Sequence, residues 1–185
     1  MTFSPTLSAA AAASALTLLA GCSTTASPPA MFNQSSLPEA VRVPAGHRIA
    51  METVGVGEIT YECRARKDSA GQFEWVFVGP EARLLSRTGQ PVGRYFGPPA
   101  TWESNDGSRL TATQLAVAPS GSANLPLQLV RANPAMGMGA LQGISHIQRV
   151  ATVGGVAPAA ACGEANQSAR QTVKYQADYI FWKAV

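Results

Sequence analysis

Two acidic side chains lie close together near the middle of this 185-residue chain, next to an aromatic residue. Glu103 and Asp106 flank the turn that follows Trp102. Paired carboxylates beside an aromatic side chain are a pattern that can bind or cleave a sugar. The dipeptide Asp106-Gly107 equally fits a type I′ hairpin turn, with Glu103 in solvent. We favour the hairpin interpretation, and the sequence predicts no catalytic residue here.

The segment just before these carboxylates is apolar and rich in proline. Tyr95, Phe96 and Trp102, with the prolines between them, are predicted to form an exposed apolar patch. Such patches mark sites for a ligand or a partner protein. The predicted ligand-binding residues are Tyr95, Phe96, Trp102, Glu103 and Asp106.

Other motifs that could carry chemistry are incomplete. The run Gly143-Ile144-Ser145-His146-Ile147 begins like a nucleophile elbow but lacks the closing glycine and lies in a strand pattern. The glycines in 55–57 and 137–143 lack the spacing of a phosphate-binding loop, so both segments are predicted to be turns or bulges. The sequence predicts neither a cofactor nor a metal site.

The N-terminal residues have the pattern of a targeting signal. Residues 1–21 have no charged side chain and end in the run Leu19-Ala20-Gly21 before Cys22, which predicts a cleaved export signal. The run resembles the lipobox of bacterial lipoproteins, although no Lys or Arg precedes the apolar stretch. The resemblance implies a lipid on Cys22 and a protein of the cell envelope. Ser23 favours the outer membrane, facing the periplasm or the surface. The alternative is an ordinary secretory signal with a chance cysteine.

Two further cysteines remain once Cys22 is lipidated. Cys63 and Cys162 can pair in only one way in an exported chain, and the periplasm is oxidising. A metal site is the weaker alternative, because the two histidines, His47 and His146, show no ligand spacing with them. We therefore predict a Cys63–Cys162 disulfide.

The charge of the chain is modestly basic. Fourteen Lys and Arg residues against eleven Asp and Glu give a formal net charge of +3. No basic stripe alternates with aromatic residues, so a nucleic-acid partner is not expected. The charge allows only a weak attraction to anionic lipids or acidic glycans.

The remaining sequence predicts one all-β domain. Residues 22–44 are rich in Pro, Ser and Ala and are expected to form an extended tether, while residues 45–185 alternate apolar and polar side chains with a period of two. About eight strands form a β-sandwich or a closed antiparallel barrel. A helical turn is expected only near residues 157–161. The strands are predicted at 48–54, 58–65, 73–78 (ended by Gly79-Pro80), 92–96, 109–117, 125–131, 144–153 and 172–181.

Spaced blocks within this domain resemble a family of secreted bacterial and fungal proteins, the domain of unknown function numbered thirty-four fifty-five. The blocks are Val43-Pro44-Ala45-Gly46, Tyr61-Glu62-Cys63, Trp75 with Gly79-Pro80-Glu81-Ala82, Trp102-Glu103 with Asp106-Gly107-Ser108, Ile147-Gln148-Arg149, Thr152-x-Gly154-Gly155 with Pro158 and Cys162, and Tyr175-x-Ala177-Asp178-Tyr179. The resemblance implies an exported domain and no particular activity. The resemblance implies that the side chains of Ile147 and Arg149, two residues apart on one strand, both point inward. A buried arginine at this position is predicted to pair with a carboxylate such as Asp178, and we favour this pairing over a role in ligand binding.

Three functions remain open from the sequence. The leading hypothesis is a non-catalytic, lipid-anchored envelope protein that binds a glycan, a small ligand or a partner protein through the loop from Tyr95 to Asp106. The second is a hydrolase of an envelope glycan or ester that uses Glu103, Asp106 and His146. The third is a purely structural lipoprotein.

Overall fold

The structure, a computed structural model, describes residues 1–2 and 32–185. Residues 3–21 of the predicted signal, Cys22 and the predicted tether up to residue 31 lie outside the described residues. The chain divides into two units, Met1–Phe32 and Asn33–Val185, and the second contains all the regular structure described below. In the described part of the chain, no helix is long and apolar enough to cross a membrane.

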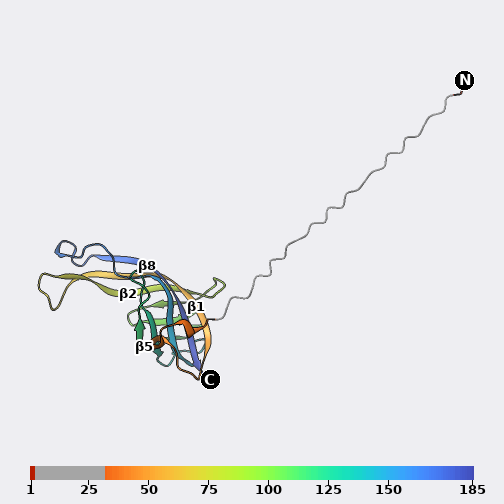
Figure 1. Cartoon of the computed structure of the whole chain (residues 1–185), viewed down its shortest axis with the longest axis horizontal. Helices are drawn as coiled ribbons and strands as arrows, with labels where there is room; N and C mark the ends of the chain where they lie inside the picture. The colour runs from red at the N-terminus through yellow and green to blue at the C-terminus, as the bar shows by residue number, and fades with distance from the viewer. Residues whose placement is uncertain (3–31) are drawn as a thin grey trace. The chain divides into compact units, whose positions relative to one another are not determined.

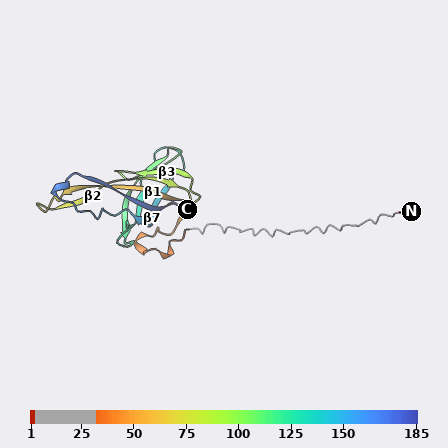
Figure 2. The same cartoon turned by 90° about the horizontal axis from the view of Figure 1, so that it is seen from above.

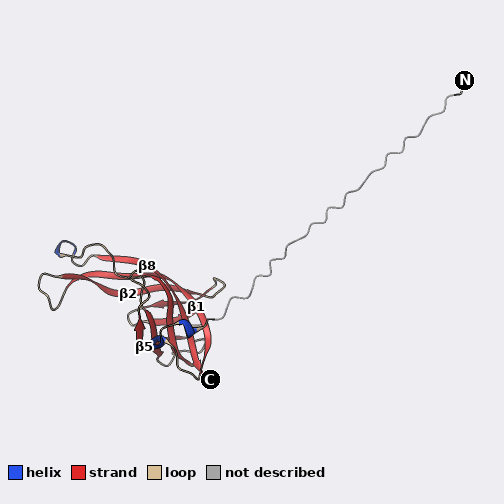
Figure 3. Cartoon of the chain, viewed as in Figure 1, coloured by secondary structure: helices blue, strands red, loops and turns tan. Residues whose placement is uncertain are grey.

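The second unit is a single antiparallel sheet of eight strands that closes on itself (Figures 1 and 3). Each strand pairs with its neighbour in the sequence, and β8 pairs with β1 to close the barrel. The all-β prediction is confirmed, and of the two predicted architectures the closed barrel is the one formed. The strands are β1 (His47–Ala65), β2 (Phe73–Leu85), β3 (Pro91–Phe96), β4 (Thr101–Ser104), β5 (Arg109–Ala118), β6 (Leu127–Ala132), β7 (Ile144–Gly154) and β8 (Arg170–Ala184).

Strand β1 is longer than the sequence pattern predicted. Residues 48–54 and 58–65 form one continuous strand, so the turn or bulge expected at residues 55–57 is wrong. Gly55 and Gly57 serve close packing instead. A Cβ atom at Gly55 would clash with the ring of Tyr179, and one at Gly57 would clash with the Glu81 carbonyl and Ala82. Glycine therefore lets other residues of the barrel approach this strand closely.

Strand β2 likewise runs past Gly79-Pro80, which were expected to end it. The pairing of β1 with β2 shifts register between Thr60 and Tyr61, opposite this dipeptide. A bulge of this kind accommodates a proline, because the irregular pairing does not require every backbone N–H to donate.

The interior of the barrel is filled by aromatic side chains. The rings of Tyr95 and Trp102 have centroids 4.7 Å apart, and Tyr179 lies 5.1 Å from Tyr95 and 5.8 Å from Trp102. All three residues belong to the buried core. Since tilted and edge-on ring contacts add to the gain from burial, this cluster is a principal source of the barrel's stability.

The last part of the predicted tether packs on the barrel. The 3₁₀ turns η1 (Gln34–Ser36) and η2 (Glu39–Val41) precede β1, and both Val41 and Val43 are buried. Residues 33–43 therefore belong to the folded unit, and an extended tether was the wrong expectation for them.

One buried glutamine connects this N-terminal segment to the barrel. The Gln148 side chain accepts a hydrogen bond from Trp182 Nε1 at 2.8 Å and donates to the Val41 carbonyl at 2.6 Å. It also donates to Gln34 Oε1 at 3.1 Å, and the Gln34 amide pairs with the backbone of Val43. We call Gln34, Gln148 and Trp182 the glutamine latch.

Strands β1, β2 and β8 extend to one side of the barrel as an arm (Figures 1 and 2). We define the arm as residues 62–76 and 157–172, which comprise the outer strand ends and the segments that join them. The 3₁₀ turn η3 (Glu164–Asn166) lies in the arm, three residues beyond the helical turn expected near 157–161. The arm therefore places Cys63 and Cys162 away from the aromatic interior.

Candidate functional site

The five predicted ligand-binding residues do not form one exposed surface. Tyr95 and Trp102 are only 6% and 2% exposed, so the prediction that they form an exposed apolar patch is wrong. On β3 and β4 these two side chains point into the barrel, where they pair across the strands with each other. Alternation along a strand assigns neighbouring side chains to opposite faces, but it does not show that the face with Tyr95 is the buried one.

Phe96 and Glu103 lie outside the barrel interior. Arg94 donates to a Glu103 carboxylate oxygen, with the shorter contact from Nη2 at 3.0 Å. The Arg94 guanidinium also lies 4.6 Å from the centre of the Phe96 ring. Arg94 thus engages both predicted site residues in a cation–π contact and an ion pair across neighbouring strands.

Asp106 organises a turn. Its Oδ1 accepts from the Ser108 backbone N–H and hydroxyl, and its Oδ2 accepts from the Ala140 N–H at 2.7 Å. These hydrogen bonds, led by that of the Ser108 hydroxyl, lower the pKa of Asp106 to about 2. Gly107 is the one residue of the turn with a positive φ, so the loop is a type I turn with a bulge and the predicted type I′ turn is wrong.

The hydrolase residues are not brought together. His146 lies beside His47, with ring centroids 4.8 Å apart, and its Nδ1 is 3.1 Å from the Ser145 hydroxyl. In the described residues no hydrogen bond or ion pair joins His146 to Glu103 or Asp106. No group of three or more His, Cys, Asp and Glu side chains is placed to hold a metal ion within residues 1–2 and 32–185.

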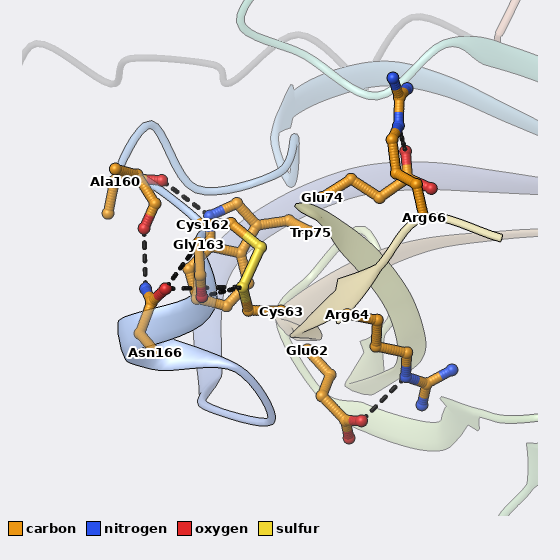
Figure 4. Close-up of a disulfide and its surroundings, with 11 residues drawn as sticks. Glu62, Cys63, Arg64, Arg66, Glu74, Trp75, Ala160, Cys162, Gly163 and Asn166 are labelled. Atoms are coloured by element: carbon orange, nitrogen blue, oxygen red, sulfur yellow. Dashed lines mark hydrogen bonds and ion pairs between the residues drawn. A yellow bond between two sulfur atoms is a disulfide. The ribbon is translucent and has the colours of Figure 1, made fainter. Parts of the chain in front are cut away.

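The predicted disulfide is confirmed. Cys63 on β1 and Cys162 are bonded, with Cα atoms 5.5 Å apart, and Cys63 is fully buried (Figure 4). Trp75 lies next to the bond and donates from Nε1 to the Ala160 carbonyl at 2.7 Å. Asn166 accepts from the Gly163 N–H and donates to the Ala161 carbonyl, which fixes the loop that carries Cys162.

A groove of about 740 Å³ crosses five strands, β7, β8, β1, β2 and β3. Its aliphatic lining comes from Val56 and Val153, and Val153 is 59% exposed. A groove of this volume is large enough for a ligand of several residues. Its other lining residues are Gly57, Glu58, Glu81, Ala82, Arg83, Arg94, Gly154, Lys174, Tyr175 and Gln176.

Strand register sets the pattern of charge in the groove. Glu58 lies opposite Glu81 on one side and Lys174 on the other, and Arg83 lies opposite Arg94. Glu58, Glu81, Arg83 and Lys174 are exposed, and none of the four has an ion-pair partner in the part of the chain that the structure describes. The groove therefore presents two acids and two bases that are available to a ligand.

Sequence reasoning missed this groove because its residues lie between positions 56 and 176. The available signal was the polar half of the alternation: Glu58 and Lys174 lie within the predicted strands 58–65 and 172–181, but they become neighbours only when the barrel closes. Ordinary strand alternation does not reveal which strands become neighbours.

These observations define a disulfide-linked, eight-stranded antiparallel barrel with an outer groove. The family described as Protein of unknown function (DUF3455) matches residues 44–183, and the chain belongs to this family. The resemblance inferred from the spaced blocks is thus confirmed. Neither the curated proteins nor the solved structures contain a match to this chain.

Proposed function

We propose that this protein is a lipid-anchored protein of the cell envelope and acts as a non-catalytic binding module through its outer groove. The observation that carries the proposal is the combination of exposed Val153 with four charged side chains that have no ion-pair partner in the described residues. Both signs of charge beside an aliphatic lining suit a peptide segment of a partner protein. Such a segment offers side chains of both kinds.

A glycan is a weaker candidate ligand for the groove. Sugar-binding surfaces that rely on aromatic stacking need an exposed ring, and Tyr175, the aromatic residue that lines the groove, is only 4% exposed. Trp102, the aromatic residue that the sugar hypothesis relied on, is in the core. The groove's chemistry therefore favours a charged polypeptide.

Site-specific photo-crosslinking in cells tests the binding function. A photoreactive amino acid at Val153 should yield a discrete adduct, while the same residue at exposed Thr113 on β5 should not. The double charge reversal Arg83→Glu with Lys174→Glu should abolish the Val153 adduct. Identical adduct patterns at Val153 and Thr113, or a Val153 adduct that survives the reversal, would contradict the proposal.

The anchor is tested separately by labelling cells with radioactive palmitate. The wild-type protein should incorporate label and fractionate with the outer membrane, whereas a Cys22→Ser variant should do neither. An unlabelled wild-type protein would favour an ordinary secretory signal and leave the groove proposal intact.

A further inference from the structure

Arg149 lies on β7, where it borders the buried tyrosines of the barrel. It is half-buried on β7, and its Nε and Nη2 both donate to the Pro126 carbonyl, at 3.2 and 3.1 Å. The carboxylate predicted to pair with it, Asp178, instead accepts from Arg87 Nη1 at 2.6 Å. No carboxylate of the described residues lies within ion-pair distance of Arg149. Its charge therefore has no counter-charge in this part of the chain.

The Arg149 side chain lines a cavity of about 30 Å³ inside the barrel. Tyr95, Tyr175 and Tyr179 line the same cavity, together with the apolar side chains of Phe77 and Leu125. A space of this size accepts a group of a few atoms. Phe77 is 51% exposed, so one of the residues that line the cavity also reaches the surface of the barrel.

The polar groups around the cavity are mainly donors. An arginine has five N–H groups, and the two hydrogen bonds to Pro126 leave three of those of Arg149 without a partner in the described residues. The Tyr95 hydroxyl makes no hydrogen bond there either. Tyr175 and Tyr179 have their hydroxyl oxygens 3.3 Å apart, so one donates to the other and one proton is left over.

Burial keeps these phenols as donors. It raises the pKa of Tyr95, Tyr175 and Tyr179, because a phenolate would lose its hydration inside the barrel. The hydroxyls are therefore protonated at neutral pH. A cluster of donors beside an arginine selects a ligand that only accepts hydrogen bonds and carries negative charge, and an ionised carboxylate has both properties.

We propose that this cavity binds the carboxylate group of a small organic acid, held by Arg149 and the hydroxyls of Tyr95 and Tyr175, with the rest of the ligand extending past Phe77 and Leu125. The apolar lining on that side favours an acid with a short apolar tail. The outer groove and this cavity share Tyr175 but no charged residue. The proposal therefore does not depend on what the groove binds.

The test compares butyrate with butyramide, which has nearly the same shape but no charge. Each is titrated into the ¹⁵N-labelled protein at constant ionic strength, and backbone amide shifts are followed. Sodium chloride is titrated separately, to identify the shifts that added salt alone produces. Butyrate should bind saturably, at least tenfold tighter than butyramide, with shifts concentrated around residues 149, 95 and 175. Sodium chloride should not reproduce these shifts.

Three variants locate the site. Arg149→Gln should weaken butyrate binding at least tenfold, and Tyr95→Phe should weaken it severalfold, because each removes donors to the carboxylate. The matched control, Arg83→Gln in the groove, should bind butyrate like the wild type. If Arg149→Gln does not fold, the result with Tyr95→Phe decides the test. This variant should keep the fold, because it removes only one oxygen atom from the core. Equal affinities for butyrate and butyramide, the same shifts with chloride, or wild-type affinity in the variant that decides would overturn the proposal.

Discussion

The barrel and the arm share strands β1, β2 and β8 but are held together differently. In the barrel these strands surround the rings of Tyr95, Trp102 and Tyr179, so burial supplies most of the stability. In the arm they have almost no interior of their own, and the Cys63–Cys162 bond lies where a core would be. The contrast indicates that a covalent link substitutes for apolar burial where the sheet leaves the barrel.

The arm's other contacts are mostly polar and near its surface. Glu62 accepts from Arg64 and Arg170, each at 2.8 Å, and Arg66 pairs with Glu74 at 3.1 Å. Exposed ion pairs of this kind contribute little to stability, because water screens them. The arm is therefore expected to open at a lower free energy than the barrel.

The largest effect is expected in the barrel interior. Trp102→Ala should lower the free energy of unfolding by about 3–5 kcal/mol, because it leaves a cavity next to Tyr95 and Tyr179. Trp102→Phe should cost clearly less, since the buried indole N–H has no hydrogen-bond partner to lose. Urea unfolding of both variants measures this. If Trp102→Ala left the free energy of unfolding nearly unchanged, burial of aromatic side chains would not be the main source of the barrel's stability.

The arm should respond most to loss of its disulfide. The bond joins residues 99 positions apart, and removing a native disulfide typically costs about 2–5 kcal/mol. In the double variant Cys63→Ala with Cys162→Ala, hydrogen exchange should accelerate in residues 62–76 and 157–172 more than in β4 to β6. The wild type under reducing conditions is the control. Equal acceleration throughout would show that the arm and the barrel unfold as one unit.

The glutamine latch provides a third, intermediate effect. Gln148→Ala should destabilise the protein by about 1–3 kcal/mol, because it leaves the Trp182 indole N–H and the Val41 carbonyl without partners. Trypsin should then cut faster after the exposed Arg42. The control is Ser35→Ala, in the same segment but with an exposed side chain. If trypsin cuts Gln148→Ala at the wild-type rate, the latch does not hold residues 33–43.

The smallest effect concerns acid sensitivity of the β4–β5 turn. The pKa of Asp106 is lowered from 3.8 to about 2 in the folded protein, so its carboxylate stabilises the fold above about pH 4, and this contribution is lost as the pH falls towards 2. The stability advantage of the wild type over Asp106→Asn should shrink across that window. Urea midpoints between pH 2 and 7 measure it. In a Ser108→Ala background the pH dependence should weaken, and an unchanged dependence would contradict the assignment to this hydrogen bond.

The strands were largely predictable because alternation is a local property. The burial pattern of β8 follows it in Tyr175, Ala177 and Tyr179. β4 was missed because its four residues, Thr101–Ser104, are too few to show a period. The continuity of β1 was missed because the reason for a glycine at position 55 is the ring of Tyr179, which leaves no room for a Cβ atom there and lies over a hundred residues away in the sequence.

The sites were less predictable than the strands, for a related reason. The disulfide followed from counting cysteines, and the inward direction of Arg149 followed from its register. The partner of Arg149 could not be predicted in this way. Asp178 instead forms an ion pair with Arg87, which lies on the connection after β2 and reaches Asp178 only once the barrel is closed. Lys174 likewise becomes a neighbour of Glu58 in the groove only through the pairing of β8 with β1.

The pairing of β1 with β8 also determines when the protein can fold. Strand β1 needs Arg170–Ala184, which follow all the other strands in the chain, as its partner, and the Cys63–Cys162 bond likewise joins β1 to a segment that follows β7. Contacts between distant parts of a sequence form slowly, because a long loop must close first. A growing chain therefore cannot close the barrel before β8 has been made. If the chain is exported, as we propose, this delay keeps it in a form that can still be threaded through a membrane.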